Sequence, residues 1–506
     1  MSVFQPLEAV PQAASRYRDA LTDPARADRA VLISLVVYTV LWTIYATIAK
    51  GSQGLHYDMA EVIAWSRDLQ LGYLKHPPLA AATVWLWFSV FPVAEWSYYL
   101  LAMAIAAIAL WFAWKLSADY LDIEKRVVGL ALLTFIPFFN FHVLKFNVNT
   151  VMMPVWAATT FWFLRSYETH SKVYAALAGI GAAGCMLGKY WSIFLVIGLA
   201  LAALIDRRRA QYFFSAAPWI TVAAGAIVLA PHLMWLMQHD FAPFGYAMTI
   251  HGAKPFGATV IAAFGYLAGS IGYVAIPLMI VLVASWPSRA MLADIMWPSE
   301  PRRRLAAAAF WGPFLLPMFG AVASGTEITS LWSMPAWTLL PVLLLSSPQV
   351  TLRPLDTRRI LIASVAVPLV MLIVAPVFAI MVHSSGPRSA AAHGQVLAAQ
   401  VERDWKQVTQ QPLRYVGGDA EIAYSVVAYA HDRPQALPGL PAPDAALLKA
   451  RGMALVCFAE DAACVSAARA QAPPDSVVTT TEIWRHYWGM AGKPQRYAIV
   501  IVPPRP

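Results

Sequence analysis

Long apolar runs separated by short polar segments fill the first three quarters of the chain. Eleven of them approach the ~20 residues that an α-helix needs to cross the hydrocarbon core of a bilayer. The eleven runs cover approximately residues 30–49, 96–114, 127–141, 147–164, 173–187, 191–205, 212–237, 256–286, 306–323, 333–348 and 360–382. This pattern predicts an all-α protein that crosses a membrane many times.

A further apolar run, Leu79–Val93, is only fifteen residues long and lies between Pro78 and Pro92. If it were a span, the arginine runs at 207–209 and 302–304 would face the outside. That arrangement would oppose the tendency of basic loops to stay in the cytoplasm. We therefore expect this run to form a helix that lies on the outer surface of the membrane.

The tail of the chain has a different pattern. Short β-type runs such as "ALVCFA" and "RYAIVIV" alternate there with helix-like segments. They predict a small α/β domain at 384–506, behind a membrane domain at 1–383. An odd number of spans would place this tail on the outer, periplasm-like side. Cys457 and Cys464 would then lie in oxidising surroundings, where they either pair or stay two buried thiols.

Composition agrees with the membrane interpretation. Charged residues make up 13% of the 506 residues and hydrophobic residues 59%, whereas a soluble chain carries about 25% charged residues. The net charge of +9 is explained by basic cytoplasmic loops, so no nucleic-acid partner is expected. The chain contains no Gly-rich phosphate loop, HExxH or GxSxG motif, which disfavours an ATPase, a metalloprotease or a serine hydrolase.

Ionisable and amide side chains at the outer ends of the spans are the candidate functional residues. An ionisable group costs roughly 2.5–3.5 kcal/mol at the centre of a membrane helix, so each one is a functional candidate by default. The outer loop at 50–95 is the richest in such groups. The candidates are Asp58, Glu61, Lys75, His76, Lys145, Asn149, Lys189, His251 and Glu327.

The two carboxylates of the outer loop have two interpretations. Asp58 and Glu61 are three residues apart at the start of an expected helix, which is the spacing of a capping box. Alternatively, a carboxylate beside Lys and His groups is the minimum equipment for a transfer reaction: a base for the attacking hydroxyl and cations for a departing anion. The spacing alone leaves both interpretations open.

A family resemblance favours the second interpretation. The segment "YDMAEVIAWSRDLQLGYLKHPPLAAATVWLWF" resembles the first outer loop of the GT-C glycosyltransferases, specifically the family 39-like and aminoarabinose-transferase-like members. The likeness continues in family order through "LKFNVNTVMMPVWAATTFWFL", "LGKYWSIFLV", "APHLMWLMQHDF" and "SLWSMPAWTLLP". The resemblance implies a GT-C fold, a donor sugar on a polyprenyl phosphate, and transfer on the non-cytoplasmic face.

The resemblance also suggests roles for individual residues. Asp58 matches the first acid of the family motif and is the candidate general base, while Met59 replaces the adjacent Glu and leaves a second role to Glu61. Lys75 and His76 stand where aminoarabinose transferases carry an acid–Lys pair before Pro-Pro. In those transferases the acid helps to bind a metal, which Lys75 cannot do. Whether this protein binds a divalent ion is therefore left open. Its candidate ligands are Glu61, His76 and His251; no other cofactor is expected.

The remaining candidates are assigned to the substrates. Lys145 and Lys189 are expected to hold the lipid phosphate, and Asn149 stands where many relatives carry an Asp. The expected partners are a polyprenyl-phosphate sugar and a lipid or glycolipid acceptor such as lipid A, and the expected state is a monomer in a bacterial inner membrane. The sugar is not specified by the sequence. The alternative is a transporter or flippase of lipid-linked or anionic solutes; transporters favour internal repeats, and none is visible.

Overall fold

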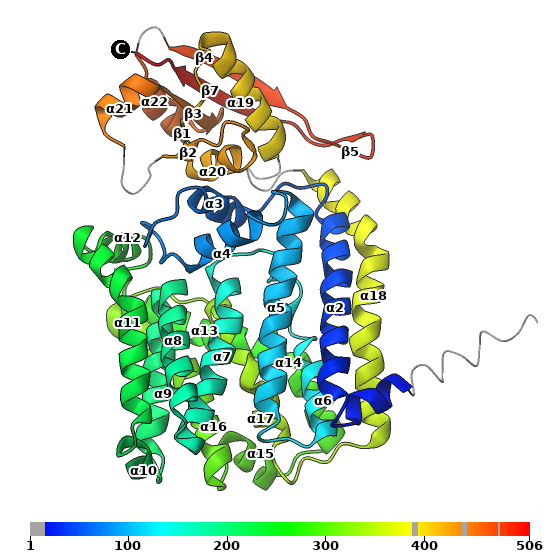
Figure 1. The fold of residues 1–506 in the computed structure, drawn as a ribbon. Helices are drawn as coiled ribbons and strands as arrows, with labels where there is room; N and C mark the ends of the chain where they lie inside the picture. Colours follow the sequence, from blue (N-terminus) through cyan, green and yellow to red (C-terminus); the bar gives the residue numbers. More distant parts are fainter. Residues whose placement is uncertain (1–15, 253, 387–392, 438–442, 474–475, 506) are drawn as a thin grey trace, which may run out of the picture.

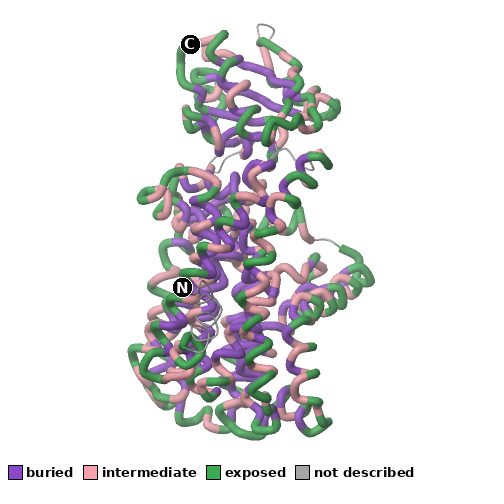
Figure 2. Tube along the Cα trace, turned by 90° about the vertical axis from the view of Figure 1, so that its right-hand side faces the viewer, coloured by how far each residue is buried: buried purple, intermediate pink, exposed green. Residues whose placement is uncertain are grey.

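The computed structural model describes residues 16–505 except 253, 387–392, 438–442 and 474–475. A bundle of long helices forms the lower part of the molecule, and a small α/β domain lies above it (Figure 1). Buried residues gather separately along the bundle and in the sheet of the upper domain (Figure 2). The predicted combination of an all-α membrane part with a C-terminal α/β part is therefore confirmed.

Each predicted apolar run coincides with one helix or with two consecutive helices. Among the described residues, six helices are long and apolar enough to cross a membrane: α2 (Ala27–Ala49), α5 (Glu95–Ser117), α11 (Ala217–Gln238), α13 (Phe256–Tyr273), α16 (Pro301–Ser324) and α18 (Pro354–Ser385). The other runs form α6 (Ile123–Leu133), η1 (Pro137–Phe139), α7 (Val148–Thr169), α8 (Lys172–Gly188), η2 (Tyr190–Ser192), α9 (Ile193–Ile205), α14 (Ala275–Ser285), η3 (Ser330–Leu339) and α17 (Leu340–Leu345).

Several predicted spans are interrupted, and proline explains the interruption in two of them. The run at 256–286 divides at Val274 into α13 and α14, because Pro277 in the first turn of α14 has no N–H for a continuing helix. The run at 333–348 is a 3₁₀-helix followed by α17, with Pro335 inside the former and Pro341 at the start of the latter.

The short run after Pro78 forms α4 (Leu79–Phe88). Its ten residues span about 15 Å, half of the ~30 Å hydrocarbon core. It lies beside α3 (Tyr57–Ser66) at the upper end of the bundle (Figure 1). A helix this short is consistent with the expected position on the membrane surface.

Basic residues gather at the opposite end of the bundle. The arginine run 207–209 precedes and begins α10 (Arg209–Phe213), and the run 302–304 lies in the first turn of α16, near α15 (Arg289–Met296). These elements lie at the lower end in Figure 1, with α3 and α4 at the upper end. The bundle therefore has one arginine-rich end and one end that carries the predicted outer loop.

The C-terminal domain is a five-stranded sheet in the order β2-β1-β3-β7-β4. Its parallel part joins β1 (Tyr415–Gly418) to β2 (Gln435–Ala436) and β3 (Met453–Phe458); β7 (Gln495–Val502) runs antiparallel to β3 and β4 (Val477–Ile483). The helices are α19 (Gly394–Val408), α20 (Ala420–Tyr429), α21 (Ala445–Arg451) and α22 (Ala462–Ala470).

Cys457 and Cys464 form a disulfide, with Cα atoms 5.9 Å apart, which answers the open question of their pairing. The predicted boundary at 383/384 falls in the last turn of α18 and stays a prediction.

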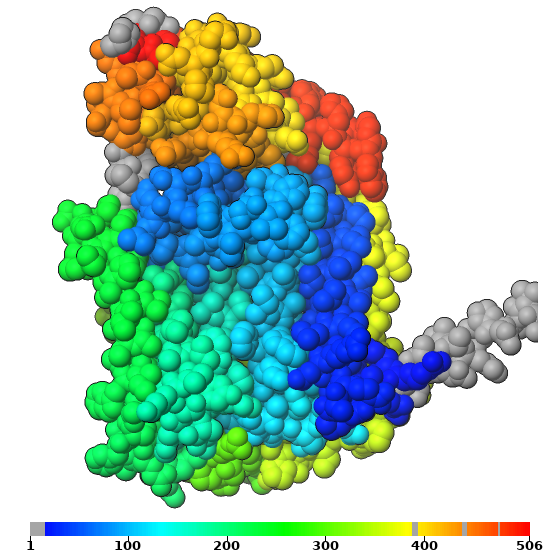
Figure 3. Space-filling model, viewed as in Figure 1, coloured from blue at the N-terminus to red at the C-terminus, as the bar shows by residue number. Residues whose placement is uncertain are grey.

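The domain lies directly on the outer loop (Figure 3). A hairpin of β5 (His486–Tyr487) and β6 (Met490–Ala491) contacts the ends of two membrane helices. The Arg485 guanidinium donates to the Gly51 carbonyl at 3.0 Å and the Tyr487 hydroxyl donates to the Ile48 carbonyl at 3.3 Å, both at the end of α2. On α18, His383 bonds the Met490 carbonyl at 3.0 Å. The upper domain is thus anchored to the bundle at several points.

Candidate active site

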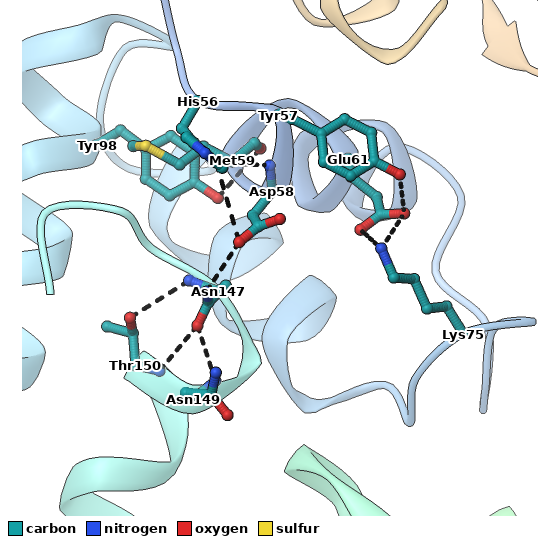
Figure 4. Close-up of polar contacts among 10 residues, drawn as sticks. All are labelled: His56, Tyr57, Asp58, Met59, Glu61, Lys75, Tyr98, Asn147, Asn149 and Thr150. Carbon is teal, nitrogen blue, oxygen red and sulfur yellow. Dashed lines mark hydrogen bonds and ion pairs between the residues drawn. The ribbon is translucent and has the colours of Figure 1, made fainter. Parts of the chain in front are cut away.

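Helix α3 carries both candidate carboxylates, and its N-terminal cap is His56. The His56 Nδ1 accepts a hydrogen bond from the Asp58 backbone N–H at 3.1 Å, so the helix begins at Tyr57 (Figure 4). Asp58 is then the second helical residue and Glu61 the fifth. The capping-box interpretation of these two carboxylates is therefore wrong, because the imidazole takes the capping position and both carboxylates bind elsewhere.

Asp58 is held by the N-terminus of α7. Its Oδ2 accepts from Asn147 Nδ2 at 2.9 Å and lies 3.9 Å from His56 Nδ1. Asn147 is itself the cap of α7, where its Oδ1 accepts from the N–H groups of Asn149 and Thr150, and this fixes the direction in which its amide N–H₂ points. In the described part of the chain Asp58 Oδ1 accepts no hydrogen bond, and 28% of the side chain is exposed. Asp58 is a positioned carboxylate with one free oxygen.

Glu61 lies in a contrasting environment. Only 6% of its side chain is exposed, and its oxygens accept from Lys75 Nζ at 3.0 and 3.3 Å and from the Tyr57 hydroxyl at 3.2 Å. Burial raises the pKa of Glu61 to about 7, although Lys75 and Tyr57 favour the ionised form. Burial also opposes the charge on Lys75, but Glu61 outweighs it and raises the pKa of Lys75. Glu61 therefore serves mainly to hold Lys75, whereas Asp58 stays available.

Lys189 approaches from the turn between α8 and η2. Its Nζ donates to Asn149 Oδ1 at 3.1 Å and lies 4.0 Å from the centre of the Trp332 ring. Burial lowers the pKa of Lys189 to about 7; the negative charge of Asp58 opposes this change and the positive charge of Lys75 adds to it. Because both direct partners are neutral, this ammonium group is suited to bind an anion that arrives from outside.

His76 and His251 complete a basic cluster, which we define as Lys75, His76, Lys189 and His251. Burial lowers the pKa of His76 well below its ordinary value, and the charges of Lys189, Lys75 and His251 lower it further. His251 ends α12 (Ala242–His251), and its ring lies 5.7 Å from the ring of Trp332. Burial and the Lys189 charge lower its pKa as well. The two histidines are thus favoured in their neutral form beside two lysines.

Two further candidates have other direct neighbours. Lys145 interacts electrostatically with Lys50, His142 and His56. Glu327 is exposed and lies 3.9 Å from Lys254; its backbone N–H donates to the His251 carbonyl at 2.9 Å, and its charge opposes the lowering of the pKa of His251. That Lys145 and Lys189 hold the lipid phosphate together stays a prediction.

The candidate metal ligands do not form a metal site. Across the described residues, no group of three or more His, Cys, Asp or Glu side chains could hold a metal ion. Glu61 already binds Lys75 and Tyr57. Glu61, His76 and His251 therefore do not fit a divalent ion, and no step of the chemistry is assigned to one.

Several contacts of the site were missed in the sequence, for different reasons. Tyr57 is four residues before Glu61, a spacing that brings side chains together on a helix and could have indicated the bond. Asn147 caps α7, as an Asn before an apolar run indicates, but its bond to Asp58 joins distant segments and has no local signal. The contact of Lys189 with Trp332 joins segments far apart in the chain and leaves no local signal, and histidine is not among the preferred caps that would have indicated His56.

Three comparisons with known proteins show what the chain is similar to. Residues 75–235 match the family model described as dolichyl-phosphate-mannose-protein mannosyltransferase. A lipopolysaccharide core galacturonosyltransferase, RgtB of Rhizobium johnstonii, is 28% identical over 335 residues, which is 64% of this chain and 66% of RgtB, slightly less than two thirds of that relative. ArnT from Cupriavidus metallidurans has a similar structure, both bound to undecaprenyl phosphate (TM-score 0.59) and in the apo state (TM-score 0.58). Each match is 11% identical and covers 93% of this chain and 97% of ArnT.

The fold, the polar end of the bundle and these comparisons define the class. The chain has the GT-C fold, and it is similar in sequence to glycosyltransferases, as the sequence resemblance predicts. RgtB and ArnT are the named relatives to which it is similar.

Proposed function

We propose that this protein transfers a sugar from a polyprenyl-phosphate donor to an envelope glycolipid at the periplasmic face of a bacterial inner membrane. The observation that carries the proposal is the difference between its two carboxylates. Asp58 keeps a free oxygen beside the basic cluster, while Glu61 is buried and paired with Lys75. One carboxylate is thus available as a base and the other organises a cation.

Asp58 is the proposed general base. The acceptor hydroxyl gives its proton to Asp58 Oδ1 as its oxygen forms a bond to the anomeric carbon of the sugar. The amide of Asn147 holds the other carboxylate oxygen at 2.9 Å, so the orientation of the base is set before the acceptor arrives. A positioned general base contributes roughly 10²–10⁴-fold to the rate of such a step.

The basic cluster is the proposed site of the leaving group. As the bond between the anomeric carbon and the phosphate oxygen breaks, its electron pair goes to the lipid phosphate, which departs as an anion. Among the described residues, the direct partners of Lys189 are neutral, and Lys75 is oriented by Glu61 at 3.0 Å. Ammonium groups fixed where negative charge develops stabilise the transition state more than the ground state.

The relatives support the substrate class. ArnT binds undecaprenyl phosphate and RgtB is named as a galacturonosyltransferase of the lipopolysaccharide core. We therefore propose a polyprenyl phosphate as the carrier and a lipopolysaccharide-type glycolipid as the acceptor. A uronic acid is the first sugar to test, because the galacturonosyltransferase is the relative with the higher sequence identity.

A single-turnover reaction tests the proposal. Purified protein in detergent, in excess over undecaprenyl-phosphate galacturonic acid as the donor probe, is mixed with lipopolysaccharide core as the acceptor. We expect free undecaprenyl phosphate and glycosylated acceptor to appear together in equal amounts. A transporter or flippase would move the lipid-linked sugar across vesicles and leave it intact. Intact donor with every sugar carrier and acceptor tried would refute the transfer reaction.

A further inference from the structure

Helix α3 is packed between two bodies of the protein. Met59, Val62 and Ile63 are buried in the core of the membrane bundle, while Ala64 packs against the core of the C-terminal domain. In Figure 1 α3 lies directly between the bundle and α20 of that domain. The helix that carries Asp58 and Glu61 therefore depends on both bodies for its position.

Hydrogen bonds to the end of α20 hold both flanks of α3. After α3, the Arg67 guanidinium donates to the carbonyls of Val427 and Ala428, the latter at 3.0 Å, where the last turn of α20 leaves carbonyls without helical partners. Before α3, the Leu55 N–H donates to the Tyr429 hydroxyl at 2.8 Å.

The Tyr429 hydroxyl also joins α20 to the bundle. It donates to the Glu95 carboxylate at the start of α5, at 2.6 Å. A single phenol thus ties together α20, the residue that leads into α3 and a membrane helix. The position of α3 is fixed at two points by one short helix of the C-terminal domain.

Between these two points, α20 reaches the buried carboxylate. The Tyr424 ring lies edge-on against the Tyr57 ring, with centroids 5.8 Å apart and an angle of 63°. Tyr57 in turn donates its hydroxyl hydrogen bond to Glu61 at 3.2 Å, and Glu61 holds Lys75. A continuous chain of contacts therefore runs from the C-terminal domain to a cation of the basic cluster.

We propose that α20 is a positioning element of the active site, and that Tyr424 is a positioning residue that acts through Tyr57 on the Glu61–Lys75 pair. This inference rests on the proposed transfer function and assigns a role in it to the C-terminal domain. Tyr424 contacts no reacting atom. Its ring fixes the Tyr57 ring, and thereby the direction of the hydroxyl that bonds Glu61.

A double-mutant cycle in the full-length protein tests this role. Tyr424→Ala removes the ring, and Tyr57→Phe removes only the hydroxyl that bonds Glu61. Because a small misplacement of a reactive group is costly, we expect each variant to lower kcat by about 10- to 100-fold, with KM for the donor nearly unchanged. The combined variant should lose little more than either single one, because both interrupt the same chain of contacts. Tyr424→Phe keeps the ring and should restore wild-type kcat.

Several results would contradict the inference. Losses that multiply in the double variant would show that Tyr424 acts independently of Tyr57, and wild-type kcat in Tyr424→Ala or in Tyr57→Phe would refute the connection outright. If Tyr424→Ala does not fold, Tyr424→Leu keeps the apolar volume and takes its place in the cycle. If the wild-type protein is active and the losses of the two variants multiply, only this inference is overturned. If the wild-type protein has no transfer activity, the proposed function fails and this inference fails with it.

Discussion

The two ends of the helix bundle both carry partly buried charges, and the partners of these charges differ. At the arginine-rich end, Arg165 forms two hydrogen bonds with Asp119, at 2.9 and 2.8 Å, and Arg303 lies 2.7 Å from Asp294. The other end also has an ion pair, Lys75 with Glu61, and in addition Lys189, which contacts an amide oxygen and an aromatic ring. The partners of Lys189, and not the presence of charge, are what we compare with the arginine-rich end.

This difference has a physical reason. A buried ion pair loses much of its attraction to the cost of removing both groups from water, so it fixes geometry more than it adds stability. A buried cation with neutral partners also loses its hydration, but it has no counter-ion in the protein. An incoming phosphate would be that counter-ion. This difference supports the proposal that the end with Asp58 and Lys189 binds an anionic substrate.

Removing the free carboxylate should have the largest effect. Asp58→Asn keeps the size of the side chain but removes the proton acceptor, so we expect transfer to slow by roughly 10²–10⁴-fold while donor affinity changes little. Single-turnover rates and donor binding measure the two effects. The matched control is Asp119→Asn at the arginine-rich end, which should affect stability but not the rate. Equal rate losses in both variants would contradict the assignment of Asp58 as the base, because a carboxylate at the arginine-rich end would then matter as much for the rate.

The buried carboxylate should instead control stability. Burial raises the pKa of Glu61 from an ordinary 4.5 to about 7, so the folded state binds more protons than the unfolded state between these values. Its contribution to stability is complete below pH ~4.5 and is lost as pH rises through ~7, by roughly 3 kcal/mol.

Glu61→Gln removes this titration. Between pH 5 and 7.5, we expect the melting temperature of the wild-type protein to fall more steeply than that of Glu61→Gln, as thermal unfolding in detergent would show. Parallel curves for the two proteins would mean that Glu61 is not buried as the geometry indicates.

Lys189 should make donor binding depend on pH. Burial lowers the pKa of Lys189 to about 7, so the free protein loses this charge as pH rises above that value, and donor affinity should fall by up to about tenfold per pH unit. Lys189→Arg keeps a positive charge at every pH and should flatten the profile. Binding of undecaprenyl phosphate between pH 6.5 and 9 measures it. The same steep fall in Lys189→Arg would assign the titration to another group.

The sequence predicted the fold more completely than the site, and the reason is the range of the contacts. Helices and their prolines are local features, so runs of apolar residues located them even where Pro277 divides one. Asp58 and Lys75 were conspicuous because charges are rare in so apolar a chain. Their partners could not be foreseen: Asn147 is 89 residues from Asp58, and only the approach of the N-terminal cap of α7 to α3 brings the two together.

The smallest effect is expected from a lysine at the arginine-rich end. Lys115 lies 2.8 Å from Asp28, and the two side chains are 36% and 51% exposed. An ion pair this exposed contributes about 1 kcal/mol or less, because water screens it and two long side chains lose freedom to form it. Asp28 also keeps its bond from the Trp114 indole N–H at 2.7 Å, so Lys115→Gln should leave transfer unchanged and lower thermal stability only slightly.

Lys189→Gln makes the same chemical change at the other end of the bundle. It removes a cation that the proposed leaving group requires, so donor turnover should fall by at least tenfold with a similarly small change in stability. Turnover and thermal unfolding are measured on both variants side by side. If Lys115→Gln and Lys189→Gln lose turnover equally, the loss comes from the removal of a lysine near the membrane surface in general, and the partners of each charge do not decide its role.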